Sequence, residues 1–261
     1  GGPLNIGNLI RYVQAEVVGA DVVYDPPHKT RWEGIYHPDV GAVFDDPDVY
    51  LAWYPSRHRI RVGILFSRTH WVNGDLAVED ALIRELERNY DVLPVFCFGV
   101  SDKEIGARSD REVIDTFFAG RISALIDART FTPPRDADAF TEALAKLGVP
   151  VFHPLILYHR TEAEWRADTE GMRGSDVSWY VAMPEFFGVI EMVPLGAAES
   201  RDQAGTEGER HVPIAERVEK FVGRVKKWVD LASRPAAERR VAFILHNKPC
   251  ASVEASVGAG A

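Results

Sequence analysis

The chain has 261 residues, of which 46% are hydrophobic and 26% charged, so it has enough apolar material for a sizeable globular core. The formal net charge of −9 argues against a general nucleic-acid binder and against a protein that binds anionic membranes, because both need a basic surface. No apolar run approaches the roughly 20 residues that span a bilayer, no signal peptide is visible, and two cysteines cannot form a disulfide framework, so we expect a cytoplasmic protein.

The first predicted segment, residues 1–57, is a helix followed by an aromatic-rich connection. Apolar residues recur at helical spacing as far as Val18, and Gly19 is a plausible stop signal. The connection that follows is rich in proline and in aromatic residues. Because aromatic side chains at this density favour burial, we expect an ordered connection and no flexible linker.

Residues 58–196 are predicted to form an α/β domain. Short apolar runs, typical of buried parallel strands, alternate here with amphipathic helical patterns. We expect strands over 61–66, 91–98, 122–126, 149–153 and 187–193. This alternation predicts a parallel, flavodoxin-like or Rossmann-like layered sheet with helices on both faces.

The rest of the chain is predicted to begin a second unit. Residues 197–212 are polar and contain glycine, which is typical of a surface loop or linker. Within residues 213–261, an amphipathic helix over 214–229 precedes an apolar strand over 240–245. We interpret these as the helix and first strand of a truncated second α/β unit, and therefore expect the chain to be an internal fragment of a longer protein.

Several common catalytic motifs are missing from the sequence. There is no G-x-x-x-x-G-K-[ST] phosphate loop and no G-x-G-x-x-G after the first strand. CxxC, HExxH and G-x-S-x-G are absent as well. We therefore expect that the chain hydrolyses no nucleotide itself and holds neither a redox cofactor nor a zinc ion.

The stretch SRTHWVNGD (67–75) is predicted to be a polar loop after the first strand, with Asp75 capping the next helix. Open α/β sheets place ligands at this end of their strands. We therefore propose substrate-binding roles for four side chains. Arg could pair with a carboxylate, His could exchange a proton, and Trp could stack on a flat ring. The alternative is that Trp71 packs against a neighbouring domain and His70 bonds to backbone. The four are Arg68, His70, Trp71 and Asn73.

A second polar motif, GIYHPD (34–39), lies in the aromatic-rich connection. His37 and Asp39 could present ligands to a metal ion, since imidazole and carboxylate are common metal ligands. The alternative, which we favour, is that they stabilise a turn by bonding to backbone.

The last motif, HNKPCASVEASVGAGA (246–261), directly follows the strand expected over 240–245. Pro249 can occupy the first turn of a helix, whose N-terminus attracts carboxylates, so Asn247 is a candidate substrate-binding residue. His246 and Glu254 are candidate metal-binding and catalytic residues, and Cys250 would favour cobalt or zinc over magnesium. The alternative is a capped strand–loop–helix with Glu254 solvated.

Several stretches together resemble the large subunit shared by cobaltochelatase and magnesium chelatase. They are GGPLNIGNLIRY, GIYHPD, YLAWY, RVGILFSRTHWVNGDLAVEDALIRELE and RVAFILHNKPCASVEASVGAGA. The resemblance implies a CobN-like subunit that binds a tetrapyrrole and receives cobalt or magnesium as its substrate metal. It also implies two partners, a AAA+ ATPase subunit that uses the ATP and a subunit with a metal-binding fold. The last motif departs from the asparagine- and glycine-rich versions of the family, which leaves the metal and the ring open.

Two other readings of the sequence remain at this point. The domain could be a non-catalytic scaffold or interaction domain within the same subunit. It could also be an unrelated α/β transferase, for example one that uses nucleotide sugars, which would need a second complete sheet and a nucleotide site.

Overall fold

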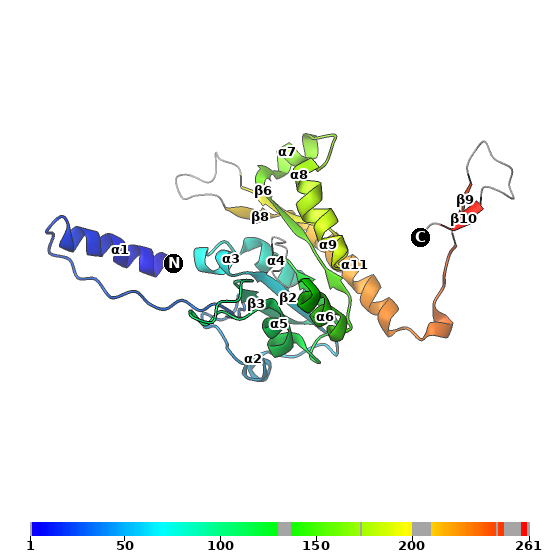
Figure 1. Cartoon of the computed structure of the whole chain (residues 1–261), viewed down its shortest axis with the longest axis horizontal. Helices are drawn as coiled ribbons and strands as arrows, with labels where there is room; N and C mark the ends of the chain where they lie inside the picture. The colour runs from blue at the N-terminus through cyan, green and yellow to red at the C-terminus, as the bar shows by residue number, and fades with distance from the viewer. Residues whose placement is uncertain are drawn as a thin grey trace.

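The apolar runs near residues 61–66 and 91–98 form neighbouring strands at the centre of a sheet in the computed structural model of the chain (Figure 1). The structure describes residues 2–129, 137–172, 174–199, 210–243, 245–247 and 257–259. The strands of the sheet, in the spatial order β1-β3-β2-β4-β5, are β1 (Gly34–Ile35), β3 (Asp91–Cys97), β2 (Arg61–Ser67), β4 (Ala124–Asp127) and β5 (Val151–Phe152). All are parallel except β1, which pairs antiparallel with β3, so the predicted α/β class is confirmed.

Helices cover both faces of this sheet. Strands β3 and β4 lie on opposite sides of β2, so right-handed crossovers place the helix after β2 on one face and the helices after β3 and β4 on the other. The first is α4 (Ala77–Leu86), and the others are α5 (Asp110–Val113), the π-helical η1 (Ile114–Phe118) and α6 (Ala137–Leu147). Burial on both faces explains why β2 and β3 are nearly continuous apolar runs.

A second, three-stranded sheet follows that the sequence analysis did not predict. It consists of β6 (Leu155–Thr161), β7 (Pro194–Ala198) and β8 (His211–Pro213), with β6 parallel to β7 and β8 antiparallel to β7. The segment between β6 and β7 is helical as far as Phe186. Its elements are α7 (Glu162–Ala167), α8 (Gly174–Val177), the π-helical η2 (Ser178–Ala182) and α9 (Met183–Phe186).

The strand predicted over 187–193 is wrong. Helix α9 ends at Phe186, and only Ile190 makes a bridge, to Phe152 of β5. Two residues with positive φ, Gly188 at 72° and Glu191 at 66°, interrupt the extended conformation that a strand needs. The carboxylate of Glu191 accepts hydrogen bonds from the Arg224 guanidinium and the Trp228 indole, so it is fixed by a helix and not by a sheet.

The helix expected to open a second unit belongs to the core of the first. Helix α11 (Ala215–Ser233) buries an apolar stripe in the same cluster as the five-stranded sheet, and its Phe221 packs edge-on against Phe152 of β5. The range 197–212, expected to be a loop, begins in β7 and ends in β8, because its first and last residues pair with each other across the two strands.

The strand predicted over 240–245 is not found in that form. Residues 240–243 are irregular and exposed after the short 3₁₀ helix η3 (Ala236–Glu238), and β9 (Leu245–Asn247) pairs antiparallel with β10 (Val257–Ala259). In Figure 1 these two strands lie near the C-terminus, well apart from the five-stranded sheet.

The N-terminal segment contains the predicted helix and an ordered aromatic connection. Helix α1 (Pro3–Glu16) extends away from the sheets in Figure 1, and the chain then returns to them. In the connection, α2 (Pro47–Trp53) brings Tyr50 and Trp53 against Phe44. The Tyr50 hydroxyl donates to the carbonyl of Val92 in β3, which fixes this aromatic group beside the sheet.

Candidate functional site

The stretch after β2, predicted to be a polar loop, is instead the short helix α3 (Arg68–Asn73). The Ser67 hydroxyl accepts a hydrogen bond from the Thr69 amide at its start, and Gly74, with φ 71°, ends it in the left-handed conformation. Asp75 does not cap α4, whose N-cap position is held by Leu76. A short capped helix fits the six residues between the strand and Gly74, and its inner face turns His70 toward the interior.

His70 is buried between a carboxylate and a hydroxyl group. Its Nδ1 lies 2.5 Å from Oε1 of Glu79 in α4, and its Nε2 lies 3.0 Å from the Tyr158 hydroxyl in β6. The Glu79 side chain is buried too, and its second oxygen, Oε2, has no hydrogen-bond partner among the described residues. Because burying a charge without a partner is costly, His70 and Glu79 stabilise each other.

A second histidine completes this group. Asp75 accepts hydrogen bonds from both the backbone amide of His211 (3.0 Å) and its ring Nδ1 (2.6 Å). The His211 ring stacks beside that of His70, with centroids 6.2 Å apart, and meets the ring of Tyr158 edge-on at 4.8 Å. We call these five residues, His70, Asp75, Glu79, Tyr158 and His211, the buried polar cluster.

The buried polar cluster joins the two sheets. Three of its members follow β2, on α3, on α4 and between them, whereas Tyr158 and His211 lie on β6 and β8 of the second sheet. The hydrogen bonds between Tyr158 and His70 and between His211 and Asp75 therefore link the second sheet to the elements that follow β2. Because hydrogen bonds are directional, these contacts specify the relative position of the two layers more closely than apolar contact does.

Sequence reasoning found His70 but missed the other four members. Glu79 carried a usable signal, because it lies on the apolar stripe of its helix, one turn before Leu82 and Ile83. A carboxylate in that position predicts a buried partner. Tyr158 and His211 offered no comparable signal, since the strands that carry them were not predicted.

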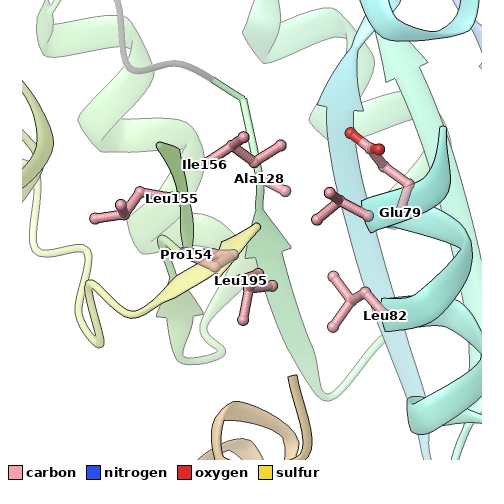
Figure 2. Close-up of a pocket in the computed structure, with 8 residues that line it drawn as sticks. Glu79, Leu82, Ala128, Pro154, Leu155, Ile156 and Leu195 are labelled. Carbon is pink, nitrogen blue, oxygen red and sulfur yellow. The ribbon is translucent and has the colours of Figure 1, made fainter. Parts of the chain in front are cut away.

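The cavity next to the buried polar cluster is very small. Figure 2 shows Glu79 at its edge, on α4, among apolar side chains from α4 and from the second sheet. The cavity measures about 10 Å³, which is room for roughly one water molecule and far too little for a tetrapyrrole. Its lining residues are Val78, Glu79, Leu82, Ala128, Pro154, Leu155, Ile156 and Leu195.

The environment of His70 gives the junction a predicted pH dependence. Burial lowers the pKa of His70, but the hydrogen bond and charge of Glu79 and the charge of Asp75 outweigh it, so the pKa is raised above 6.5. The folded protein thus holds this proton more tightly than the unfolded chain. The stabilisation is complete below a pH of about 6.5 and is lost as the pH rises through the folded pKa.

We therefore expect the stability difference between the wild type and His70→Gln to shrink as the pH rises above about 6.5. Urea unfolding of both proteins at a series of pH values measures this difference. A difference that stays constant between about pH 6 and 9 would show that His70 gains no proton affinity on folding.

The other three candidates from this stretch point in different directions. Trp71 stacks on Phe96 of β3, with centroids 4.2 Å apart and rings 6° from parallel, so this face of the indole is already occupied. Arg68 places its guanidinium 4.2 Å from the centre of the Trp32 ring and donates from Nε to the Arg31 carbonyl. Asn73 is exposed at the end of α3. The structure thus separates these side chains from His70.

Arg68 borders an open surface hollow, where it remains available to a ligand. The hollow is lined by Lys29, Thr30, Trp32, Arg68 and Ile105. Two cationic side chains beside an indole are suited to a ligand that carries carboxylates.

The candidates near the end of the chain are not joined to the buried polar cluster. His246 and Asn247 lie in β9, which Figure 1 shows apart from α3, and the positions of their side chains are not described. Glu254 lies outside the described residues. The described residues therefore show no single cleft between the ends of β2 and β9.

The GIYHPD motif forms a partly buried structural network around His37. The His37 ring lies 3.0 Å from Oε1 of Glu87, which also accepts from the Tyr54 hydroxyl at 2.9 Å, and the Asp39 amide donates to His37 Nδ1. Arg84 pairs with the carboxylates of both Asp39 and Glu87. These contacts favour the structural interpretation of His37 over metal binding.

The described ranges contain neither a metal-binding cluster of side chains nor a helix that could span a membrane. There, no three side chains of His, Cys, Asp or Glu come together in a way that could hold a metal ion. Likewise, none of the helices in the described part of the chain combines the length and the hydropathy needed to cross a membrane.

Comparison with known proteins gives a consistent relationship. The chain is 35% identical to an uncharacterized protein of Methanocaldococcus jannaschii, over all of this chain and 21% of that protein. It is 28% identical to the chloroplastic magnesium-chelatase subunit ChlH of Oryza sativa subsp. indica and to the aerobic cobaltochelatase subunit CobN of Sinorhizobium sp. Each match covers 95% of this chain, and 19% and 20% of those proteins. The chain thus spans about a fifth of the length of these relatives.

The fold is also found in a solved structure. The catalytic subunit of cobaltochelatase from Mycobacterium tuberculosis superposes with a TM-score of 0.64 at 23% identity, over 94% of this chain and 20% of that one. The family model described as CobN/Magnesium Chelatase matches residues 1–261. Because this match spans every residue, the chain belongs to the CobN/magnesium chelatase family.

Proposed function

We propose that these 261 residues are a portion of the large subunit of an ATP-dependent metal chelatase, which inserts cobalt or magnesium into a corrin or porphyrin precursor. The observation that carries this proposal is the family match across the whole chain, together with relatives named for both magnesium chelatase and cobaltochelatase. Because the chain is about a fifth as long as those relatives, the activity belongs to the longer protein. The family match leaves the alternative of an unrelated transferase without support.

Within that protein, the part around β2 serves as a rigid support beside the tetrapyrrole. The burial of His70 and the small size of the cavity beside Glu79 favour support over direct contact with the ring. Arg68 at the surface hollow and exposed Asn73 remain the substrate-binding candidates of this stretch, and Asn247 is the candidate near β9. The hollow would receive a carboxylate at the edge of the macrocycle, since its cations are Arg68 and Lys29.

Metal insertion itself needs two chemical operations. Two pyrrole N–H protons must leave the ring, and a partly desolvated metal ion must be delivered to its nitrogens. Imidazole and carboxylate can do both, and His246 and Glu254 are the proposed pair for this task. ATP hydrolysis is assigned to a AAA+ partner subunit, and a second partner has a metal-binding fold.

The test uses the full-length protein that contains this sequence, combined with its ATPase and metal-binding partner subunits. His246→Ala and Glu254→Ala should each lower the rate of metal insertion at least tenfold, because each removes a group that accepts a proton or hands over the metal. Insertion is followed by the absorbance change of the ring, with cobalt and magnesium offered separately to a metal-free corrin precursor and to a porphyrin.

Glu238→Ala is the matched control, because Glu238 is an exposed carboxylate in the nearby 3₁₀ helix η3, and its loss should leave turnover unchanged. Turnover at the wild-type rate in both His246→Ala and Glu254→Ala would reject the assignment of these residues. Failure of the wild-type complex to insert either metal into either ring would reject the proposed function itself.

A further inference from the structure

Helix α1 presents its apolar side to solvent. Five apolar side chains recur at the helical period and form one stripe along the helix and its C-terminal end. Their exposed fractions lie between 41% and 74%, values that are unusual for a continuous apolar stripe. The residues of this stripe are Ile6, Leu9, Ile10, Val13 and Val17.

One polar flank of α1 is already occupied by the chain that returns from it. The Asn5 side chain exchanges two hydrogen bonds with the backbone of His28, both of 2.8 Å. Farther along the helix, Tyr24 donates to Glu16 and meets the ring of Tyr12 edge-on. The polar side of α1 therefore faces its own chain, and the apolar stripe faces outward, the reverse of a helix that packs on the core of its own domain.

The size of the apolar stripe indicates what kind of partner can cover it. A helix of 14 residues is about 21 Å long, so one apolar side of it offers roughly 200 Å², well below the roughly 800 Å² per partner of a stable association between separate molecules. A segment of the same polypeptide can cover such a small surface, because tethering raises its effective concentration to the millimolar range. The relatives are about five times longer than this chain, so a full-length protein of this family has ample sequence to supply that segment.

Charge argues against a membrane as the occupant. Among residues 1–30, the acidic side chains Glu16, Asp21 and Asp25 outnumber the basic side chains Arg11 and Lys29, whereas helices that bind anionic membranes are rich in Lys and Arg. We propose that the apolar stripe of α1 is an intramolecular docking surface, covered in the full-length protein by an apolar segment of the same polypeptide outside residues 1–261. This inference rests on family membership and does not depend on which metal or ring the protein uses.

The experiment compares two single-cysteine positions on α1 in the full-length protein. Val13→Cys lies on the stripe, and Arg11→Cys, two residues away and so nearly opposite around the helix, is the matched control on an exposed position. Each is reacted with a thiol reagent, and modification of the peptide that carries α1 is followed by mass spectrometry. We expect the cysteine at position 13 to react at least tenfold more slowly than the one at position 11 in the native protein, and at the same rate in urea.

Three results would overturn the proposal. Equal native rates at the two positions would show that the stripe is uncovered. Protection of position 13 that disappears on dilution would show a second copy as the occupant, and protection that needs the ATPase subunit would show a partner protein. Protection that is independent of both concentration and partner subunits supports the intramolecular segment. None of these outcomes depends on metal insertion, so the result is separate from that of the proposed function.

Discussion

Arg129→Met is expected to lower the free energy of unfolding by about 3–5 kcal/mol, because it removes the partner of two largely buried carboxylates. Arg129 lies two residues after the end of β4, and its side chain is only 14% exposed. Its Nε and Nη2 donate to the two oxygens of Asp127, at 2.8 and 2.7 Å, and Nη1 donates to Asp110 at the start of α5. Unfolding by urea, followed by circular dichroism, measures the change.

The surroundings of Arg129 explain why this loss should be large. Burial alone would raise the pKa of Asp127, but the charge and hydrogen bonds of Arg129 hold that pKa below its usual value. The same guanidinium contacts the Cys97 sulfur at 3.4 Å, and burial raises the pKa of this thiol to about 12, so Cys97 remains neutral and leaves the two carboxylates as the counter-charges of Arg129. Without Arg129, the carboxylates of Asp110 and Asp127 would have no other ion-pair partner among the described residues.

Two further variants sharpen this prediction. Arg129→Lys keeps the charge but loses the planar fork that binds both Asp127 oxygens, so an intermediate loss is expected. Arg111→Met is the matched control, because Arg111 also pairs with two carboxylates, Glu142 and Asp115, but is 46% exposed, and its loss should cost less than about 1 kcal/mol. Equal small losses in Arg129→Met and Arg111→Met would contradict the prediction.

The sheet could be predicted from sequence because burial on both faces leaves a simple signature. The expected strands over 61–66, 91–98, 122–126 and 149–153 all overlap strands of the five-stranded sheet. Each is a short apolar run bounded by polar residues or turn signals, and no contact distant in the sequence is needed to recognise it.

The second sheet could not be predicted in the same way. Its strands β7 and β8 are short, and β7 contains Gly196, which packs against Val78 of α4 too closely for a side chain. An added Cβ there would lie 2.5 Å from a methyl group of Val78. A glycine chosen for close approach to a helix weakens the strand signal in the sequence, although it positions the strand in the fold.

The candidate site shows the same division between local and tertiary information. The sequence marked the stretch 67–75 as the polar end of a strand, and that position is correct. The direction of each side chain depends on contacts far along the chain, since Tyr158 and His211 lie 88 and 136 residues from their partners His70 and Asp75. Without knowledge of the second sheet, burial of His70 could not be distinguished from exposure in a ligand cleft.

His70→Leu is expected to destabilise the protein by about 3–5 kcal/mol, because Glu79 would remain buried without its histidine partner. Glu79→Leu should cost less, about 1–3 kcal/mol, since His70 keeps the Tyr158 hydroxyl as a partner and loses one bond. The double variant replaces both polar groups by apolar ones next to a cavity that is already apolar. It should therefore be more stable than His70→Leu alone.

A double-mutant cycle of urea unfolding measures this coupling. The expected interaction energy between His70 and Glu79 is about 1–3 kcal/mol, because the two side chains are in direct contact and each is the main partner of the other. Tyr158→Phe is the matched control, since it removes one neutral hydrogen bond from the same histidine, and should cost only about 0.5–1.5 kcal/mol. Additive losses for His70→Leu and Glu79→Leu would mean that the contact between these two side chains does not stabilise the junction, which would then depend on the hydrogen bonds of Tyr158 and His211 and on apolar contacts.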